Sequence, residues 1–232
     1  MTNFASFCFS DAELRPHVPS DTLDRVQKAA QSDFSRAKGS HDWDHTLRVL
    51  RLAVHIARQE GADEGIVRAA AYLHDIGRAH PDDAGGKCCH AKQGVIRAQS
   101  ILFGESISPE TRENILHCIA AHRFRQGEPP RTLEAKVLFD ADKLDAIGAI
   151  GVARAFLFAG EIGARLHSPE VAHIARMPAY SIHDTGYREY VVKLSVIHEQ
   201  MLTATGRHLA QARHRFMVDF FDRFLEEYEG ER

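Results

Sequence analysis

The sequence predicts an all-α fold, and three observations lead to that prediction. Apolar residues recur at every third or fourth position through most of the 232 residues, which places them on one face of a helix. No stretch of six residues alternates apolar and polar side chains, as a strand with one buried face would. Helix start and stop signals, such as Ser108 before Pro109 and the glycine at Gly61, flank the periodic segments. We therefore expect a helical bundle whose active residues project from helices.

The first half of the chain is expected to contain helices separated by short breaks. The first follows Ser20, a good N-cap residue, and ends before Gly39. The second and third end at Gly61 and Gly77, and residues 80–87 form a loop rich in turn residues. The predicted helices cover residues 21–37, 41–61, 63–77, 90–105 and 109–124.

The second half is predicted to begin with one long helix from Thr132 to about residue 166. The loop over about 167–185 is long for a structureless connection, so it is expected to be functional or a mobile lid. Two further helices follow, over residues 188–202 and 206–229. The whole chain then forms a single domain, with the following parts: a core over about 20–165, the loop over about 167–185 and C-terminal helices over about 187–229.

Composition excludes several classes of function. The formal net charge of −3 argues against general attraction to a polynucleotide or an anionic membrane surface. No run of about 18 apolar residues is present, so no membrane span is expected. The N-terminal segment lacks the basic region of a signal peptide, and four cysteines do not form a disulfide framework. A cytoplasmic protein is therefore expected.

The clearest chemical signal is His74 beside Asp75, at the end of an apolar helix. Burying an imidazole and a carboxylate without a partner costs several kcal/mol, and a divalent cation would remove that cost. The alternative is a helix end with a solvated aspartate. Helical register also turns His45 and Asp142 inward. Two histidines and two carboxylates suit an octahedral Mn, Mg, Fe, Co or Ni ion better than a closed zinc site.

Three segments carrying these residues, HDWDHTLRV, AAYLHDIGR and EAKVLFDADKLDAIGAIGVAR, resemble the HD-domain superfamily of metal-dependent phosphohydrolases. They look like the bacterial stand-alone HD hydrolases related to nucleotide pyrophosphatases, over roughly residues 20–165. The resemblance implies one divalent metal ion held by His45, His74, Asp75 and Asp142. It also implies hydrolysis of a small phosphate ester or anhydride, most simply a nucleotide cut to a monophosphate and pyrophosphate.

The segment FDADK offers two aspartates, Asp140 and Asp142. The family pattern places the ligand directly before the basic residue, which selects Asp142. Asp140 lies about 200° away around the helix, so both cannot face one ion. We expect Asp140 to support a ligand or to accept hydrogen bonds from the backbone. Asp145, one turn beyond Asp142, is expected to orient a ligand or water.

Basic residues near the predicted ligands are candidates for binding phosphate and stabilising transition-state charge: Arg48, Arg78 and Lys143. Each could instead be a solvated surface charge. Asp75 is expected to act both as a ligand and as the partner of an activated water, with Arg48 and Lys143 as the other catalytic candidates.

A second group of histidines lies between the His74–Asp75 dyad and Asp142 in the sequence. His90 and His122 are expected to contact substrate phosphate or a metal-bound water, whereas His117 is expected to pack or to face solvent. The resemblance to the HD-domain superfamily leaves two alternatives to the phosphohydrolase. One is a two-iron HD-type oxygenase using His90 and His117, and the other is a nucleotide sensor without turnover. The expected partner is a small phosphorylated molecule, and no motif indicates an oligomeric state.

Overall fold

The computed structural model describes residues 18–34, 43–78, 90–123, 128–168 and 171–231. These residues form helices, turns and short connections with no strand, which confirms the all-α prediction. No described helix has both the length and the apolar character needed to cross a bilayer. The α-helices are α1 Ser20–Phe34, α2 Trp43–Glu60, α3 Glu64–Leu73, α4 His90–Leu102, α5 Pro109–Ala121, α6 Leu133–Asp145, α7 Gly148–Glu161, α8 Gly186–Val192 and α9 Ala204–Glu229.

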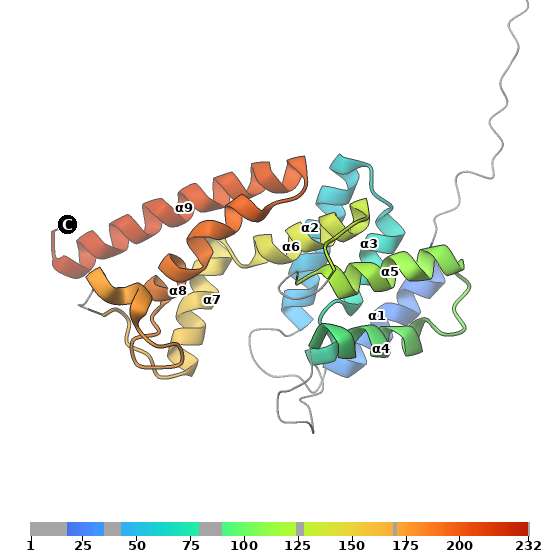
Figure 1. Ribbon diagram of the computed structural model, residues 1–232, viewed down its shortest axis with the longest axis horizontal. Coiled ribbons are helices and arrows are strands. Elements are labelled where there is room, and N and C mark those ends of the chain that lie inside the picture. The colour runs from blue at the N-terminus through green and yellow to red at the C-terminus, as the bar shows by residue number, and fades with distance from the viewer. Residues whose placement is uncertain (1–17, 35–42, 79–89, 124–127, 169–170, 232) are drawn as a thin grey trace, which may run out of the picture.

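The six N-terminal α-helices pack together as one lobe, at the right of Figure 1. Helix α2 lies against both α3 and α6, and α5 bridges α3, α4 and α6. The interface contains fully buried aliphatic side chains such as Val49, Leu73 and Leu138. Burying each such side chain contributes about 1.5–3 kcal/mol. The ends of α2, α3 and α6 are thereby fixed relative to one another.

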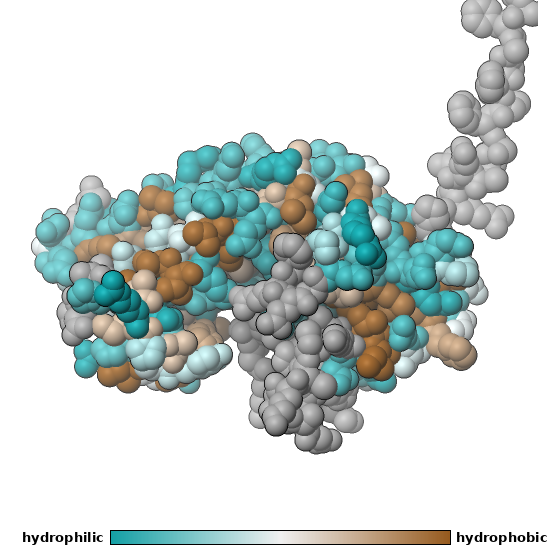
Figure 2. All heavy atoms as spheres, in the orientation of Figure 1, coloured by the Kyte–Doolittle hydropathy of each residue, from teal (hydrophilic) through white to brown (hydrophobic). Residues whose placement is uncertain are grey.

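Helices α7, α8 and α9 form the second lobe, at the left of Figure 1. Helix α9 packs on α7 and also reaches back to α6 and α2, so it ties the two lobes together. A cluster of phenylalanines holds α7 against α9, with the Phe156 and Phe224 rings 5.5 Å apart. On the face shown in Figure 2, apolar surface gathers over this lobe. Val192 of α8 and the nearby Val196 are among its exposed apolar side chains.

The prediction of one long helix over 132–166 is wrong, because the chain breaks between α6 and α7. Ile147 is extended and Gly148 has a φ of +78°, a left-handed conformation that glycine adopts most easily. A Cβ on Gly151 would lie 2.3 Å from the carbonyl oxygen of Ala146, so the turn also requires glycine there. The break lets α7 turn away from α6, and a cavity forms between them.

Other element boundaries also differ from prediction. Helix α3 ends at Leu73 instead of continuing to Gly77, and a short 3₁₀ helix, η2 Ile76–Arg78, follows the turn. The predicted loop 167–185 contains a 3₁₀ helix, η3 Val171–Arg176. The predicted helix 188–202 divides into α8 and η4 Leu194–Gln200. The predicted loop 80–87 lies outside the described residues.

Replacing Gly148 by alanine is expected to lower the free energy of unfolding by about 2–3 kcal/mol. The left-handed backbone costs roughly 1–2 kcal/mol for a residue with a Cβ, and this Cβ would lie 2.9 Å from Cγ of Arg213 on α9. Gly104→Ala is the matched control, because Gly104 has a φ of +81° but a Cβ added there would meet nothing within 4 Å. Urea denaturation should show the smaller loss for Gly104→Ala. Equal losses would mean that contact with α9 does not contribute.

Candidate metal centre and its pocket

Three helices bring the predicted ligands together. His45 lies in the first turn of α2, and Asp142 lies in the last turn of α6. His74 and Asp75 follow the end of α3, where His74 is the C-cap residue. The side chains of His45, His74 and Asp75 are buried. The early end of α3 therefore turns both residues of the dyad toward the other two helices.

The donor atoms of these residues are spaced as ligands of one cation. Nε2 of His45 lies 3.2 Å from Nε2 of His74. The same atom lies 3.5 Å from Oδ1 of Asp142 and 3.7 Å from Oδ2 of Asp75. Ligands about 2.1 Å from a common ion have neighbours roughly 3 Å apart. One atom each from His45, His74 and Asp142 also falls within 4.8 Å of the others.

Hydrogen bonds fix which ring nitrogen each histidine presents. Nδ1 of His74 lies 2.8 Å from the carbonyl oxygen of Ala71, which can only accept, so Nδ1 carries the proton. Nδ1 of His45 lies 2.7 Å from the Asp145 carboxylate and donates in the same way. Two Nε2 lone pairs then face each other across 3.2 Å. A cation between them replaces repulsion by coordination, so the donor set fits a divalent metal.

The protonation states also suit a metal site. Burial lowers the pKa of His74 to about 4, so the ring is neutral near pH 7. Burial alone would raise the pKa of Asp142, but Lys143 and the nearby histidines hold it below its usual value. The site therefore offers the neutral imidazole of His74 and the ionised carboxylate of Asp142, which are the forms that bind metals.

Asp145 organises one side of the site. Its buried carboxylate accepts hydrogen bonds from His45, from Nε of Arg48 at 2.7 Å and from Nη1 of Arg154 at 2.8 Å. Burial would raise the pKa of Asp145, but the bonds from His45 and Arg48 lower it to about 2. Asp145 was predicted to orient a ligand or water, and its hydrogen bond with His45 is a contact through which it can orient that ligand. The guanidinium of Arg48 is bonded to Asp145, and its role as a phosphate ligand stays a prediction.

Asp140 has the supporting position expected of it. Its buried carboxylate accepts from the backbone N–H groups of Leu202 at 2.9 Å and Thr203 at 2.8 Å. It also accepts from the Thr203 hydroxyl at 2.6 Å. Thr203 is the N-cap of α9, so Asp140 connects α6 to the start of that helix. Asp140 therefore supports the fold and does not face the metal centre.

Two more predicted residues adjoin the ligands. Nε2 of the buried His122 lies 3.5 Å from Oδ1 of Asp75, and its Nδ1 donates to the carbonyl oxygen of Ile119 at 2.6 Å. Nζ of Lys143 lies 3.0 Å from Oδ2 of Asp142. His122 thus presents a third imidazole Nε2 to the cluster.

The cluster of described residues does not include His117. His117 accepts a hydrogen bond from the backbone of Arg131 at 3.0 Å and is not part of the cluster, in line with its predicted packing role. The side chains of Arg78 and His90 lie outside the described part of the structure.

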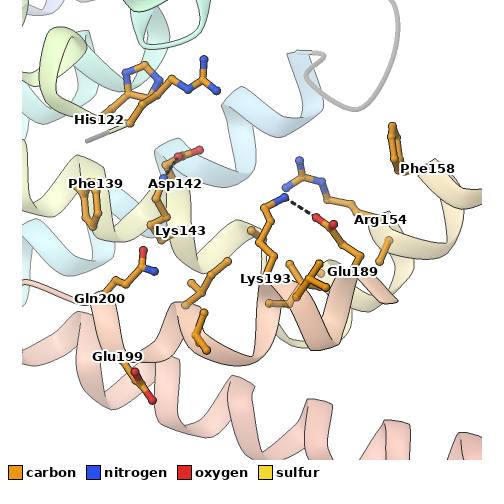
Figure 3. A pocket seen from close by; sticks show the side chains of 18 of the residues that line it. His122, Phe139, Asp142, Lys143, Arg154, Phe158, Glu189, Lys193, Glu199 and Gln200 are labelled. Carbon is orange, nitrogen blue, oxygen red and sulfur yellow. Dashed lines mark hydrogen bonds and ion pairs between the residues drawn. The ribbon is translucent and has the colours of Figure 1, made fainter. Parts of the chain in front are cut away.

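A cavity of about 1130 Å³ opens beside the metal centre, between α6, α7 and the α8–η4 segment. Asp75, His122 and Asp142 line one part of it. In Figure 3, Lys143 lies beside Asp142, and Arg154 and Lys193 lie further along the pocket toward Phe158. Neither Arg154 nor Lys193 was predicted from the sequence. The sequence feature that could have indicated Arg154 is its place as a lone arginine within the apolar segment ARAFLFAG.

A model of the HD domain matches residues 42–147, which include all four candidate ligands. The protein YpgQ of Bacillus subtilis is 33% identical over 201 residues, covering 85% of this chain and 89% of YpgQ. Ribonuclease Y of Chloroflexus aurantiacus is 32% identical over 121 residues, but the match spans only 21% of that protein.

Solved structures agree with these sequence matches. The crystal structure of B. subtilis YpgQ in complex with ADP has a TM-score of 0.66 and 32% identity, and the match covers 89% of this chain and 94% of that one. An HD-superfamily hydrolase from Bacillus thuringiensis has a TM-score of 0.70 and 27% identity, with 90% and 97% of the two chains covered. The chain is therefore a member of the HD-domain superfamily and a homologue of YpgQ.

Proposed function

We propose that the protein is a divalent-metal-dependent phosphohydrolase that cuts a nucleoside or deoxynucleoside triphosphate to a monophosphate and pyrophosphate. The observation that carries the proposal is the convergence of His45, His74, Asp75 and Asp142 at a cavity lined by basic side chains. The binding of ADP by the homologue YpgQ supports a nucleotide as the ligand.

In this proposal His45, His74, Asp75 and Asp142 hold one divalent ion, for which Mn, Mg, Fe, Co and Ni are all suitable. Such an ion polarises a phosphoryl oxygen and lowers the pKa of water. The other carboxylate oxygen of Asp75, Oδ1, lies 3.5 Å from Nε2 of His122. We assign Asp75 and His122 to position the attacking water and to accept its proton.

Cations of the chain balance the phosphate charge. Lys143, beside Asp142, is assigned to the phosphoryl group at the metal end, and Arg154 and Lys193 to phosphates further along the cavity. Both distal cations are paired in the structure, Arg154 with Asp145 and Lys193 with Glu189. Arg48, Arg78 and His90 are further candidates for contacts with substrate. Because carboxylates partly balance these cations, the pocket suits a small phosphorylated substrate better than a polynucleotide.

The experiment is a metal-by-nucleotide screen on chelator-stripped protein. We expect that one or more of the five metals restores release of monophosphate and pyrophosphate in equal amounts, measured by anion exchange and ³¹P NMR. Release of orthophosphate alone would show that the enzyme cleaves the terminal phosphate and not the bond between the α- and β-phosphates. Metal-dependent nucleotide binding without either product would favour a sensor, and an oxidised product formed with iron and O₂ would favour the oxygenase. The position of His117 outside the cluster argues against that last alternative.

A further inference from the structure

The cavity continues past its basic middle to an aromatic end. Phe158 on α7 and Tyr180, in the segment before α8, line the same cavity as Asp75 and Asp142. In Figure 3, Arg154 and Lys193 lie between Asp142 and Phe158. The pocket therefore presents ligands for a metal, then cations, then aromatic rings. Its volume of about 1130 Å³ is also far more than a pyrophosphate group needs.

Tyr180 has an unusual backbone conformation. Among the described residues it is the only non-glycine residue with a positive φ, at 56°. A residue with a Cβ is strained in this conformation, and glycine would adopt it with less strain. Strain of this kind at the rim of a pocket points to a function of the side chain.

Several contacts hold Tyr180 in this conformation. Its backbone N–H donates to Oδ2 of the buried Asp184 at 2.7 Å. Oδ1 of Asp184 accepts from Arg188 at 2.7 Å, and Nε of Arg188 donates to the carbonyl oxygen of Met177 at 2.8 Å. Residues 177–184 are thus fixed to α8, and so is the backbone from which the Tyr180 ring projects.

The ring of Tyr180 is largely open despite this rigid support. Tyr180 is 77% exposed, and its ring meets Phe158 edge to face, with centroids 5.9 Å apart and planes at 78°. An exposed tyrosine held by one edge contact leaves a π-face available for a planar group. Aromatic side chains that bind nucleic acid bases act in this way.

We propose that the Phe158–Tyr180 end of the cavity binds the base of the nucleotide and that Tyr180 is a specificity-determining residue. The inference rests on the proposed function, because the phosphates are taken to occupy the metal end. A nucleotide has its phosphates at one end and its base at the other, and the cavity has metal ligands and cations at one end and aromatic rings at the other. Stacking on Tyr180 then favours substrates with an aromatic base over bare polyphosphates.

The test compares two diphosphates, ADP and inorganic pyrophosphate, by calorimetric titration of the metal-loaded full chain. Tyr180→Ala and Tyr180→Gly are expected to raise the Kd of ADP about tenfold, as loss of one stacking contact would. The Kd of pyrophosphate should stay within about twofold. Tyr180→Phe, which keeps the ring, should behave as wild type. Phe216→Ala is the matched control, because Phe216 on α9 is exposed but does not line the cavity.

The outcomes separate this inference from the function on which it rests. Unchanged ADP binding by Tyr180→Ala, with metal-dependent turnover intact in wild type, would overturn the aromatic subsite alone. Equal weakening of ADP and pyrophosphate would also overturn it, because the tyrosine would then support only the shape of the turn. Wild-type protein that shows no metal-dependent release of monophosphate and pyrophosphate would overturn the proposed function itself.

Discussion

Replacing His74 or Asp142 by alanine should abolish both metal-dependent stabilisation and turnover. Each residue presents a donor atom within 4 Å of Nε2 of His45, so its loss leaves an incomplete site. A metal at a hundred times its Kd stabilises the wild-type fold by about 2.7 kcal/mol, and the variants should lose this increment. Turnover should fall at least about a thousandfold, because a metal ion supplies several kcal/mol of transition-state stabilisation. Thermal unfolding with and without Mn²⁺ measures the first effect without any substrate.

Asp140→Asn is the matched control, two residues from Asp142 on the same helix. It should keep the response to metal and lose about 2 kcal/mol of stability, since an amide cannot accept the bonds from both Leu202 and Thr203. Retention of full metal response in both His74→Ala and Asp142→Ala would show that the site is assigned to the wrong residues. Loss of that response in Asp140→Asn would show that the wrong aspartate was chosen.

The convergence of the candidate ligands could be predicted from the sequence because it depends on local helix phase. His45, Asp142 and Asp145 each lie on the inward face of a regular helix, where spacing determines direction. The dyad could also be recognised locally, since a histidine and an aspartate at the end of an apolar helix need a partner. Helix phase also placed Asp145 one turn beyond Asp142 and showed that Asp140 and Asp142 cannot both face one ion, but the family resemblance was needed to select Asp142 as the ligand.

The break between α6 and α7 could not be predicted in this way. Apolar residues continue at helical spacing through Ile147, so periodicity describes one helix over 132–166. Arg213, which is 65 residues away in the sequence, lies so close to Gly148 that a Cβ added there would be 2.9 Å from its Cγ. Periodicity alone therefore gave no sign of the break, because the packing of α9 against this turn involves residues distant in the sequence.

The pocket depends on the same long-range packing. Arg154 and Lys193 lie on α7 and beside α8, and they reach the site because those elements turn back toward α6. Arg48 illustrates the opposite case. Its position one turn after His45 predicts proximity to the ligands, but only the structure shows its guanidinium bonded to Asp145. The position of a residue within its helix predicts the direction of its side chain, whereas its hydrogen-bond partner depends on helices that are distant in the sequence.

Asp145→Asn should reduce metal affinity 10–100-fold although Asp145 is not itself placed among the ligands. The carboxylate accepts from Nδ1 of His45 and thereby keeps the lone pair of Nε2 directed at the metal centre. An asparagine can present its NH₂ group to Nδ1 and stabilise the wrong tautomer. The change also weakens the bonds to Arg48 and Arg154, so about 3–5 kcal/mol of stability should be lost. Titration of Mn²⁺ at a temperature where the variant is folded measures affinity separately from stability.

Asp33→Asn is the control that separates positioning from structural support. Asp33 on α1 also binds an arginine through two bonds, from Arg97 at 2.7 and 2.9 Å, and α1 carries none of the candidate ligands. This variant should lose stability, by about 1 kcal/mol because Arg97 is half-exposed, and should bind Mn²⁺ as wild type does. If Asp145→Asn lost stability while keeping wild-type metal affinity, Asp145 would be a structural ion-pair partner only. A fall in affinity confined to Asp145→Asn, with both proteins folded, would identify Asp145 as the positioning residue that directs His45 to the metal.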